Sequence, residues 1–283
     1  MLDCMLDRTR ESIKGDVASG IVALGLLPTI LTFIGCSTPE TALLGRRRPL
    51  LAFLIAAGAP AVNPLRTFEY VDPLRLLRTH ESVVRVPMAA WWQAALVSGA
   101  EYALVGAAAV NVSLACWQTG AWTVNTISCD DVYYPLLWAA LAVVIHLHGI
   151  VALALRVVAD PERRGCVNKM ARWLRHEFMP CSTQDKVVLQ RVPETYFFLV
   201  LSGWVSVGTV AHILYGTVAF SSLQFIGYVD SVRIIGRLLA STVVCRAVLR
   251  FELAGMRNAM EAAPHCGASS VGRHASDGGA HKD

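Results

Sequence analysis

Among the ionisable residues inside long stretches of apolar sequence, three are best placed to do chemistry. They are Glu101, His146 and Arg237. If these stretches cross a bilayer as helices, Glu101 and His146 both lie roughly 15 Å from one surface, and Arg237 lies roughly 13 Å from the other. An ionisable side chain at such a depth faces a partner, a cavity or the bundle interior. We therefore predict a polar cluster of these three side chains. The alternative is a structural contact of Glu101, or a protonated Glu101 bonded to a backbone carbonyl.

The eight cysteines contain no C-x-x-C pair, so the sequence predicts no metal site and no cofactor. Two of them bracket a short loop without Lys or Arg. Cys116 and Cys129 would form a disulfide if that loop faces an oxidising compartment. The alternative is that they are two separate small hydrophobic residues. No nucleophile, base and orienting partner stand at the spacing of a known catalytic motif, so an enzyme is the least favoured class.

The composition places these residues in a membrane protein. Hydrophobic residues make up 54% of the chain and charged residues only 16%, and the mean hydropathy is +0.48. A water-facing surface rarely has so few charges. The net charge of +4 comes from arginines grouped at the ends of apolar stretches, which is typical of membrane boundaries and not of a nucleic-acid surface. The expected partner is the lipid bilayer, and nucleic acid is not expected.

The fold class that we predict is all-α, a polytopic transmembrane helix bundle with about five spans. A bilayer core of about 30 Å needs roughly 20 helical residues, because lipid offers no partner to an unpaired backbone group. The last stretch is the weakest because it contains arginines. The predicted spans are residues 17–36, 89–110, 135–155, 195–220 and 228–249.

One further apolar segment, residues 49–64, is short for a full crossing. Pro60 and Pro64 would also interrupt a helix there. We interpret the segment as a short re-entrant or interfacial element that enters the membrane without crossing it. The alternative is a bundle of six spans with the N-terminus in the cytosol.

Basic residues set the expected orientation. Residues 37–88 and 156–194 carry most of the arginines, whereas residues 115–134 contain no Lys or Arg. The positive-inside rule then makes the first two segments cytosolic loops and puts the third on the opposite side. With five spans, the N-terminus is expected outside the cytosol and the C-terminus inside.

The second cytosolic loop contains an amphipathic helix with a basic side. Its apolar side chains share one face, and Lys169, Arg172 and Arg175 lie away from that face or at its edge. Such a helix fits the surface of an anionic cytosolic leaflet, where each cation contributes about 1 kcal/mol. Packing of the helix on the protein's own loops is the alternative.

Small residues recur at every fourth position of the second span, as Ala95, Gly99, Ala103 and Ala107. A stripe of this kind lets the backbones of neighbouring helices approach closely. We therefore expect the second span to be central in the bundle.

The chain divides into three parts by composition. Residues 1–16 form an N-terminal segment of mixed charge, and residues 17–255 form the bundle with its loops. Residues 256–283 are expected to form a disordered C-terminal tail, because most of that segment is rich in Gly, Ser, Ala and His without apolar periodicity.

Three short motifs in the first part of the chain resemble those of a group of fungal proteins. They are GCSTPE at residues 35–40, RRPL at 47–50 and RTFEY at 66–70. In these motifs, mainly over residues 1–80, the chain resembles uncharacterised multi-pass membrane proteins of filamentous fungi. The resemblance implies a eukaryotic membrane setting, and it implies no activity or catalytic residue.

Three classes of function are compatible with these features. A non-catalytic membrane scaffold or partner-binding protein is favoured, because the strongest features are anchoring, helix packing and leaflet contact. A small transporter or channel is the alternative, and it would use the polar cluster and the re-entrant segment. A membrane-embedded enzyme is the third class. The expected location is the plasma membrane or an endomembrane, with other membrane proteins as candidate partners.

Overall fold

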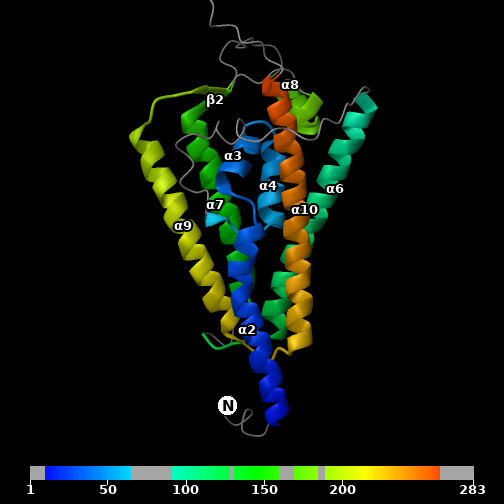
Figure 1. Ribbon diagram of the computed structural model, residues 1–283, viewed down its shortest axis with the longest axis vertical. Coiled ribbons are helices and arrows are strands. Elements are labelled where there is room, and N and C mark those ends of the chain that lie inside the picture. The colour runs from blue at the N-terminus through cyan, green and yellow to red at the C-terminus, as the bar shows by residue number, and fades with distance from the viewer. Residues whose placement is uncertain (1–9, 65–90, 128–130, 160–168, 184–188, 262–283) are drawn as a thin grey trace, which may run out of the picture.

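The computed structural model describes residues 10–64, 91–127, 131–159, 169–183 and 189–261. Within these ranges most of the chain is helical, and five long helices run along one axis (Figure 1). The prediction of an all-α helix bundle is confirmed. The long helices are α2 Glu11–Ile34, α6 Trp91–Trp122, α7 Tyr134–Arg156, α9 Tyr196–Ser221 and α10 Tyr228–Glu261.

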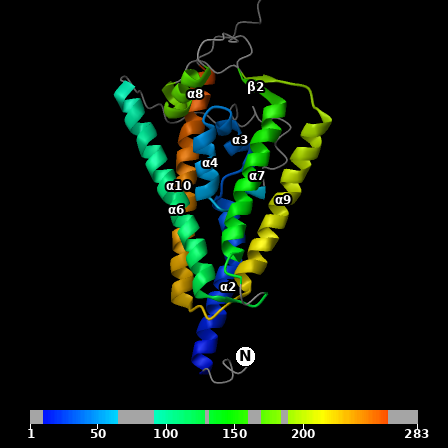
Figure 2. The same ribbon diagram turned by 180° about the vertical axis from the view of Figure 1, so that it is seen from behind.

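Four of these helices, α2, α6, α7 and α9, are long and apolar enough to cross a membrane. α2, α7 and α10 run in one direction and α6 and α9 in the other (Figure 1). From behind, α7 runs between α6 and α9 (Figure 2). Each predicted span corresponds to one long helix, but α2 begins at Glu11, within the predicted N-terminal segment, and α10 continues to Glu261. Residues 256–261 are therefore helical, and the rest of the predicted tail lies outside the described residues.

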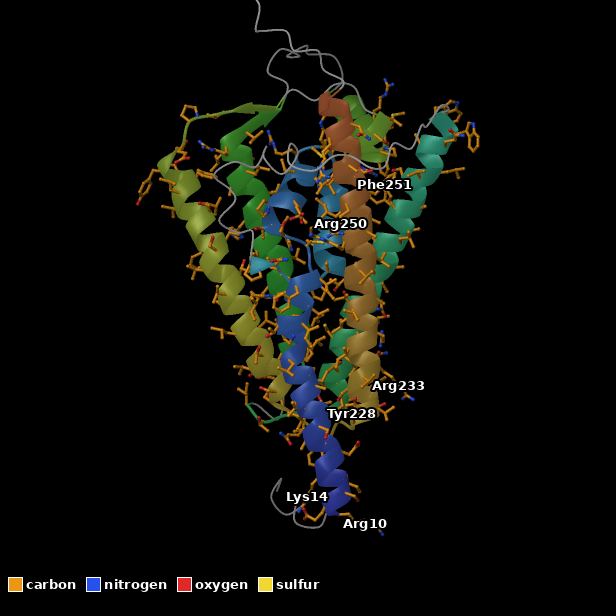
Figure 3. All side chains as sticks on the ribbon, viewed as in Figure 1. Arg10, Lys14, Tyr228, Arg233, Arg250 and Phe251 are labelled. Carbon is orange, nitrogen blue, oxygen red and sulfur yellow. The ribbon has the colours of Figure 1, made fainter. Side chains whose placement is uncertain are left out.

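α10 contains charged residues, yet its outer face is apolar. Arg237 and Arg246 are half-buried and contact other helices. Arg233 is exposed near the start of α10 and Arg250 is exposed in its second half (Figure 3), and the two lie about 25 Å apart along the helix. The exposed residues between them are all Gly, Ala or Val. This spacing is close to the thickness of a bilayer core, so α10 has the outer surface of a fifth span.

The first span is interrupted inside the bundle. After α2, the chain continues into α3, Thr38–Gly45, and turns back into α4, Pro49–Gly58. We call α3, α4 and the turn between them the α3–α4 hairpin. Every residue of α3 is buried, and so is half of α4. The half-length α4 ends inside the bundle, as expected for a re-entrant element. Within residues 37–88, predicted as a cytosolic loop, the hairpin is thus packed inside the bundle, and residues 65–88 lie outside the described residues.

Gly35 lies at the break between α2 and α3, where a larger residue does not fit. A Cβ atom there would lie 2.5 Å from the Ala61 carbonyl oxygen and 3.0 Å from the Leu31 carbonyl oxygen. We expect Gly35→Ala to lower the free energy of unfolding by about 1–3 kcal/mol, because backbone would have to move. The thermal midpoint of the detergent-solubilised protein measures this effect. Gly99→Ala is the matched control, since a Cβ at Gly99 meets no atom within 4 Å. Equal midpoints for the two variants would contradict the close contact at the break.

Short strands and a surface helix close the two ends of the bundle. The strands are β1 Val124–Asn125, β2 Val157–Ala159, β3 Leu189–Arg191 and β4 Leu223–Gln224, and β1 pairs with β4 and β2 with β3, both antiparallel. The surface helix is α8, Lys169–Phe178. α8, β2 and the turn of the hairpin lie at one end, which we call the hairpin end, and the N-terminus lies at the other (Figure 1). The two segments predicted to be cytosolic thus reach the same end of the bundle.

The interior of the bundle is packed, and its outer surface is apolar. One buried cluster contains leucines of α2 with Trp138 of α7, and a second surrounds the α3–α4 hairpin. On the outside, α9 presents Phe197, Trp204 and Val207, which are 73%, 65% and 66% exposed. Exposed apolar area on this scale is unusual for a protein in water and ordinary for one in lipid. The structure is therefore compatible with a membrane-embedded protein.

The small-residue stripe of α6 faces outward, contrary to the prediction. Its four members, Ala95, Gly99, Ala103 and Ala107, are all exposed. The opposite face of α6, with the buried residues Ser98, Glu101 and Val105, packs into the bundle. The stripe is therefore not the packing surface of α6, because polar residues with partners inside the protein face inward instead.

Candidate functional site

Arg48 ends the turn of the hairpin, and its side chain is fully buried. Its Nη1 donates to Glu101 Oε2 at 2.5 Å, its Nη2 to Ser98 Oγ at 2.8 Å and its Nε to the Glu177 carbonyl oxygen at 2.8 Å. Nη1 also lies 3.0 Å from Glu252 Oε1. Residues of α6, α8 and α10 therefore meet at one guanidinium group from the hairpin turn. We call Arg48, Ser98, Glu101, Glu177 and Glu252 the Arg48 cluster.

The local sequence explains how the hairpin turn reaches this position. Arg48 precedes Pro49 and has φ −129° and ψ 74°, outside the helical region, as expected for a residue before proline. Pro49 then begins α4, where its missing N–H group and fixed φ are tolerated. The turn thus ends sharply, with the Arg48 side chain at the N-terminus of α4.

Glu177 of α8 caps the same N-terminus of α4. Its Oε1 accepts hydrogen bonds from the Leu51 N–H group at 3.0 Å and from the Tyr102 hydroxyl at 2.5 Å. The first N–H groups of a helix have no partner within the helix, and a carboxylate there also interacts favourably with the helix dipole. One residue of α8 therefore binds Arg48 through its backbone and caps α4 through its side chain.

The cluster contains more hydrogen-bond acceptors than donors. Glu252 Oε2 accepts from the Cys181 N–H group at 3.1 Å, in the short helix η2, Cys181–Thr183. Glu101, Glu177 and Glu252 are 5%, 0% and 1% exposed. Glu101 Oε1 and Glu177 Oε2 are buried without a hydrogen-bond partner, and Glu252 Oε1 has only its ion pair with Arg48 Nη1. Buried acceptors without donors are costly, so this feature requires a physical explanation.

A second ion pair lies deeper, at the break between α2 and α3. Arg246 Nη1 donates to Glu40 Oε2 and, at 3.3 Å, to the Gly35 carbonyl oxygen. Glu40 Oε2 also accepts from Ser37 Oγ at 2.7 Å, and the two residues form a capping box at the start of α3. Arg246 precedes Glu252 by six residues on α10, so this pair lies about 9 Å below the Arg48 cluster.

Two buried histidines, His146 of α7 and His212 of α9, lie near the middle of the bundle and closer to its N-terminal end, respectively. His146 is about 18 Å from the start of α7 and about 15 Å from its end. Its Nδ1 is hydrogen-bonded to Thr41 Oγ1 at 2.8 Å, which places the first turn of α3 at mid-depth. His212 Nε2 is hydrogen-bonded to the Trp138 carbonyl oxygen at 2.9 Å. His146 Nε2 and His212 Nδ1 are buried without partners.

The structure gives Glu101, His146 and Arg237 separate partners and does not bring them together. Arg237 Nε donates to Asn111 Oδ1 at 2.9 Å and its Nη1 to Gln118 Oε1 at 2.6 Å. The predicted cluster is corrected because α6 and α10 are longer than the predicted spans. Glu101 lies in the first third of α6 and Arg237 in the first third of α10, and these helices run in opposite directions. The two residues therefore lie toward opposite ends of the bundle.

The predicted disulfide partners are not described as a pair. Cys116 is a free thiol, 1% exposed, and lies inside α6, which continues to Trp122. It belongs to the apolar cluster around Trp138 and does not bracket a loop as expected. Cys129 lies outside the described residues.

α8 forms at the predicted position. Two interpretations were open for it, binding to a leaflet surface and packing on the protein itself. Arg175 is exposed, and the side chains of Lys169 and Arg172 lie outside the described part of the chain. Trp173 and Leu174 are each 43% exposed. Phe178, in contrast, packs against Tyr102 with ring centroids 5.4 Å apart. α8 thus contacts the bundle and still presents apolar side chains, and its binding to a leaflet stays a prediction.

Sequence reasoning missed Arg48, Glu177 and Glu252 as site residues. The first two lie in segments predicted to be cytosolic loops, and Glu252 lies beyond the predicted end of the fifth span. One signal was present, because Glu177 is the only acidic residue of α8 and falls on the same face as Trp173 and Leu174. An acid on an apolar face indicates a buried partner.

Within the described ranges, no group of three or more His, Cys, Asp or Glu side chains is placed to hold a metal ion. The Arg48 cluster itself consists of ion pairs and hydrogen bonds around one guanidinium group. No family model, curated protein or solved structure matches this chain. Its function is accordingly inferred from the geometry of the hairpin and of the charges around it.

Proposed function

We propose that this chain is a small membrane transporter or channel in which the α3–α4 hairpin moves to open and close a path. The observation that carries the proposal is non-helical backbone in the interior of the bundle. Residues 35–37 and 59–63 interrupt the helices and lie beside each other, joined by a hydrogen bond of 3.2 Å from the Asn63 N–H group to the Cys36 carbonyl oxygen. In a membrane, such backbone is tolerated only where protein buries it or where it lines a water-filled cavity.

The depth of this interruption supports the proposal. Discontinuous helices surround the midplane binding sites of many secondary transporters, where half-helix ends and freed backbone groups bind ions and substrates. In this chain, the hydrogen bond between Thr41 and His146 sets the start of α3 near the middle of α7. The end of α4 at Gly58 lies close to Cys245 of α10, in the same interior region. Two half-length helices therefore end within the hydrophobic thickness.

Buried ionisable groups accompany the interruption. Glu101 and Glu252 lie at the turn of the hairpin, and the pair of Glu40 and Arg246 lies at its base. Ionisable residues inside a membrane protein are costly, and in pumps and transporters they line ion and proton pathways. These charges lie at the turn and at the base of the hairpin, so a hairpin that moves would break and re-form their ion pairs.

A second candidate is a non-catalytic scaffold that binds other membrane proteins, and a different observation favours it. Arg48 is fully buried, and the apolar cluster around the hairpin includes Leu43, Leu51 and Ile55, each 0% exposed. In a scaffold, this packing and the Arg48 cluster would hold the hairpin permanently closed. The two candidates differ in whether the interior ever becomes accessible to water.

We further propose that the protein resides in the plasma membrane or an endomembrane, with the hairpin end in the cytosol. The arginine-rich segments reach this end, which supports a cytosolic orientation. The exposed Trp173 and Leu174 of α8 suit the interface of an anionic leaflet. Partner membrane proteins would meet the apolar outer surface of the bundle.

Thiol labelling in membrane vesicles tests whether the interior opens. We compare two single-cysteine variants, one retaining Cys36 at the break and the other retaining Cys116, which are 0% and 1% exposed. A small, charged, water-soluble methanethiosulfonate reagent is added to each. Transport predicts that Cys36 reacts and that Cys116, which lies away from the hairpin, does not. If neither thiol reacts in the folded protein, the transporter proposal is overturned in favour of the scaffold. If both react alike, general unfolding explains the labelling and the proposal is equally overturned.

A further inference from the structure

Two carboxyl groups from different helices converge on one atom of Arg48. Glu101 Oε2 of α6 lies 2.5 Å from Nη1, and Glu252 Oε1 of α10 lies 3.0 Å from it. The two carboxyl groups therefore lie next to each other on one nitrogen atom. Glu101 Oε1 is buried without a hydrogen-bond donor, and the only printed contact of Glu252 Oε1 is its ion pair with Arg48 Nη1. The pair thus lacks a donor hydrogen at Glu101 Oε1.

A proton shared by the pair would supply that donor. Two ionised carboxylates at this separation repel each other strongly where water is excluded, and such pairs commonly hold one proton between them. The proton then belongs to the pair and not to either residue. With one proton bound, the pair carries a single negative charge, which the guanidinium group of Arg48 balances.

The groups around the pair do not supply the missing hydrogen-bond donor. Glu177 brings a third carboxylate, whose Oε1 is already occupied by the hydrogen bonds that cap α4. Among the described residues, the charged and titratable groups around the pair include Arg47 and Arg48 from the turn, Tyr102 from α6, Glu177 from α8 and Cys181 from η2. In the described part of the chain no ligand set for a metal ion is formed. A proton is therefore the cation that fits the site.

We propose that Glu101 and Glu252 share one proton, and that loss of this proton separates α6 from α10 at the hairpin end. The inference rests on the proposed function, because it names the proton as the ion to which the hairpin responds. The proton is released to water, and two negative charges then face each other across one guanidinium group. Their repulsion favours the state in which α6 and α10 are further apart, and the hairpin between them is freed.

Infrared spectroscopy of the wild-type protein in lipid tests the shared proton directly. A protonated carboxyl group has a carbonyl stretching band that is separate from the carboxylate bands and shifts in D2O. We expect this band near neutral pH in the wild type and its loss in both Glu101→Gln and Glu252→Gln. Glu11→Gln, in which an 88% exposed side chain is changed, is the matched control and should keep the band. A wild type without the band, or variants that retain it, would overturn the proposal. The wild-type result decides even if a variant does not fold.

A distance measurement tests the consequence for the helices. Spin labels are placed at Leu96 of α6 and Ala247 of α10, both exposed positions near the hairpin end. In the wild type, raising the pH should lengthen the distance between the labels, because deprotonation adds a negative charge. In Glu252→Gln the distance should stay short at every pH. A wild-type distance that is independent of pH, or one that follows Na⁺ at constant pH, would overturn the proposal.

The failure of this inference is distinguishable from that of the proposed function. If Cys36 is labelled but no protonated carboxyl band is seen, the bundle opens without using this proton, and only the further inference fails. A protonated band without labelling of Cys36 would leave a shared proton in a permanently closed scaffold. Only both results together support a proton-linked hairpin.

Discussion

Replacing Arg48 with methionine is expected to destabilise the protein by about 3–5 kcal/mol, because the substitution leaves buried charges without their cation. Glu101 and Glu252 would lose their ion pair, and Ser98 would lose its donor. Methionine retains an apolar chain that can fill much of the space. The thermal midpoint and the yield of monodisperse protein in detergent measure the effect.

The matched control is Arg250→Met on the outer surface of α10. Arg250 is exposed in the second half of α10 (Figure 3), so its replacement should change stability by no more than about 0.5 kcal/mol. Arg48→Lys should fall between the two, because an ammonium group restores a point charge but not the guanidinium geometry that serves four partners. If Arg48→Met and Arg250→Met had the same midpoint, the Arg48 cluster would not hold the hairpin.

The long helices could be predicted from the sequence because lipid imposes a simple requirement on them. An apolar segment of about 20 residues satisfies its backbone hydrogen bonds only as a helix. The segment at residues 49–64 was too short and contained two prolines, and the structure ends α4 at Gly58. Segment length and proline position therefore predicted correctly that the helix in this segment is too short to cross the bundle.

The Arg48 cluster could not be predicted in the same way. Its charges come from four separate elements, and only Glu101 lies in a segment predicted to span the membrane. Which charges meet depends on helix tilt, helix length and the path of the hairpin, and hydropathy does not contain these quantities. The depth of Glu101 also could not be obtained by counting residues along the predicted span, because α6 ends at Trp122 and not at residue 110. Glu101 was placed at mid-depth, where the structure has Thr41 and His146.

The hairpin is held at two levels by two different arginines. Arg48 connects its turn to α6, α8 and α10, and Arg246 connects its base to α10. Both contacts involve the partly polar helix α10, which is the span that the sequence indicated least clearly. The polar residues that made α10 look unlike a membrane helix are the same residues that bind the hairpin.

Arg246→Met is therefore expected to destabilise the protein by about 2–3 kcal/mol, less than Arg48→Met, because the Arg246 side chain is 14% exposed and partly reached by solvent. Glu40 would lose its cation, and the Gly35 carbonyl would lose a donor. Combining the change with Glu40→Gln should recover part of the loss, because the remaining buried group is then neutral. A double-mutant cycle on thermal midpoints should give a coupling of about 1–3 kcal/mol.

The same variant separates folding from opening at the break. If the pair of Arg246 and Glu40 also holds the hairpin closed, thiol labelling of Cys36 should become faster in Arg246→Met than in the wild type, while labelling of Cys116 stays unchanged. Additive effects of the two substitutions on the midpoint would show that the pair is not coupled. Equal acceleration at Cys36 and Cys116 would show that the variant loosens the whole bundle, and the pair would then stabilise the fold without controlling the hairpin.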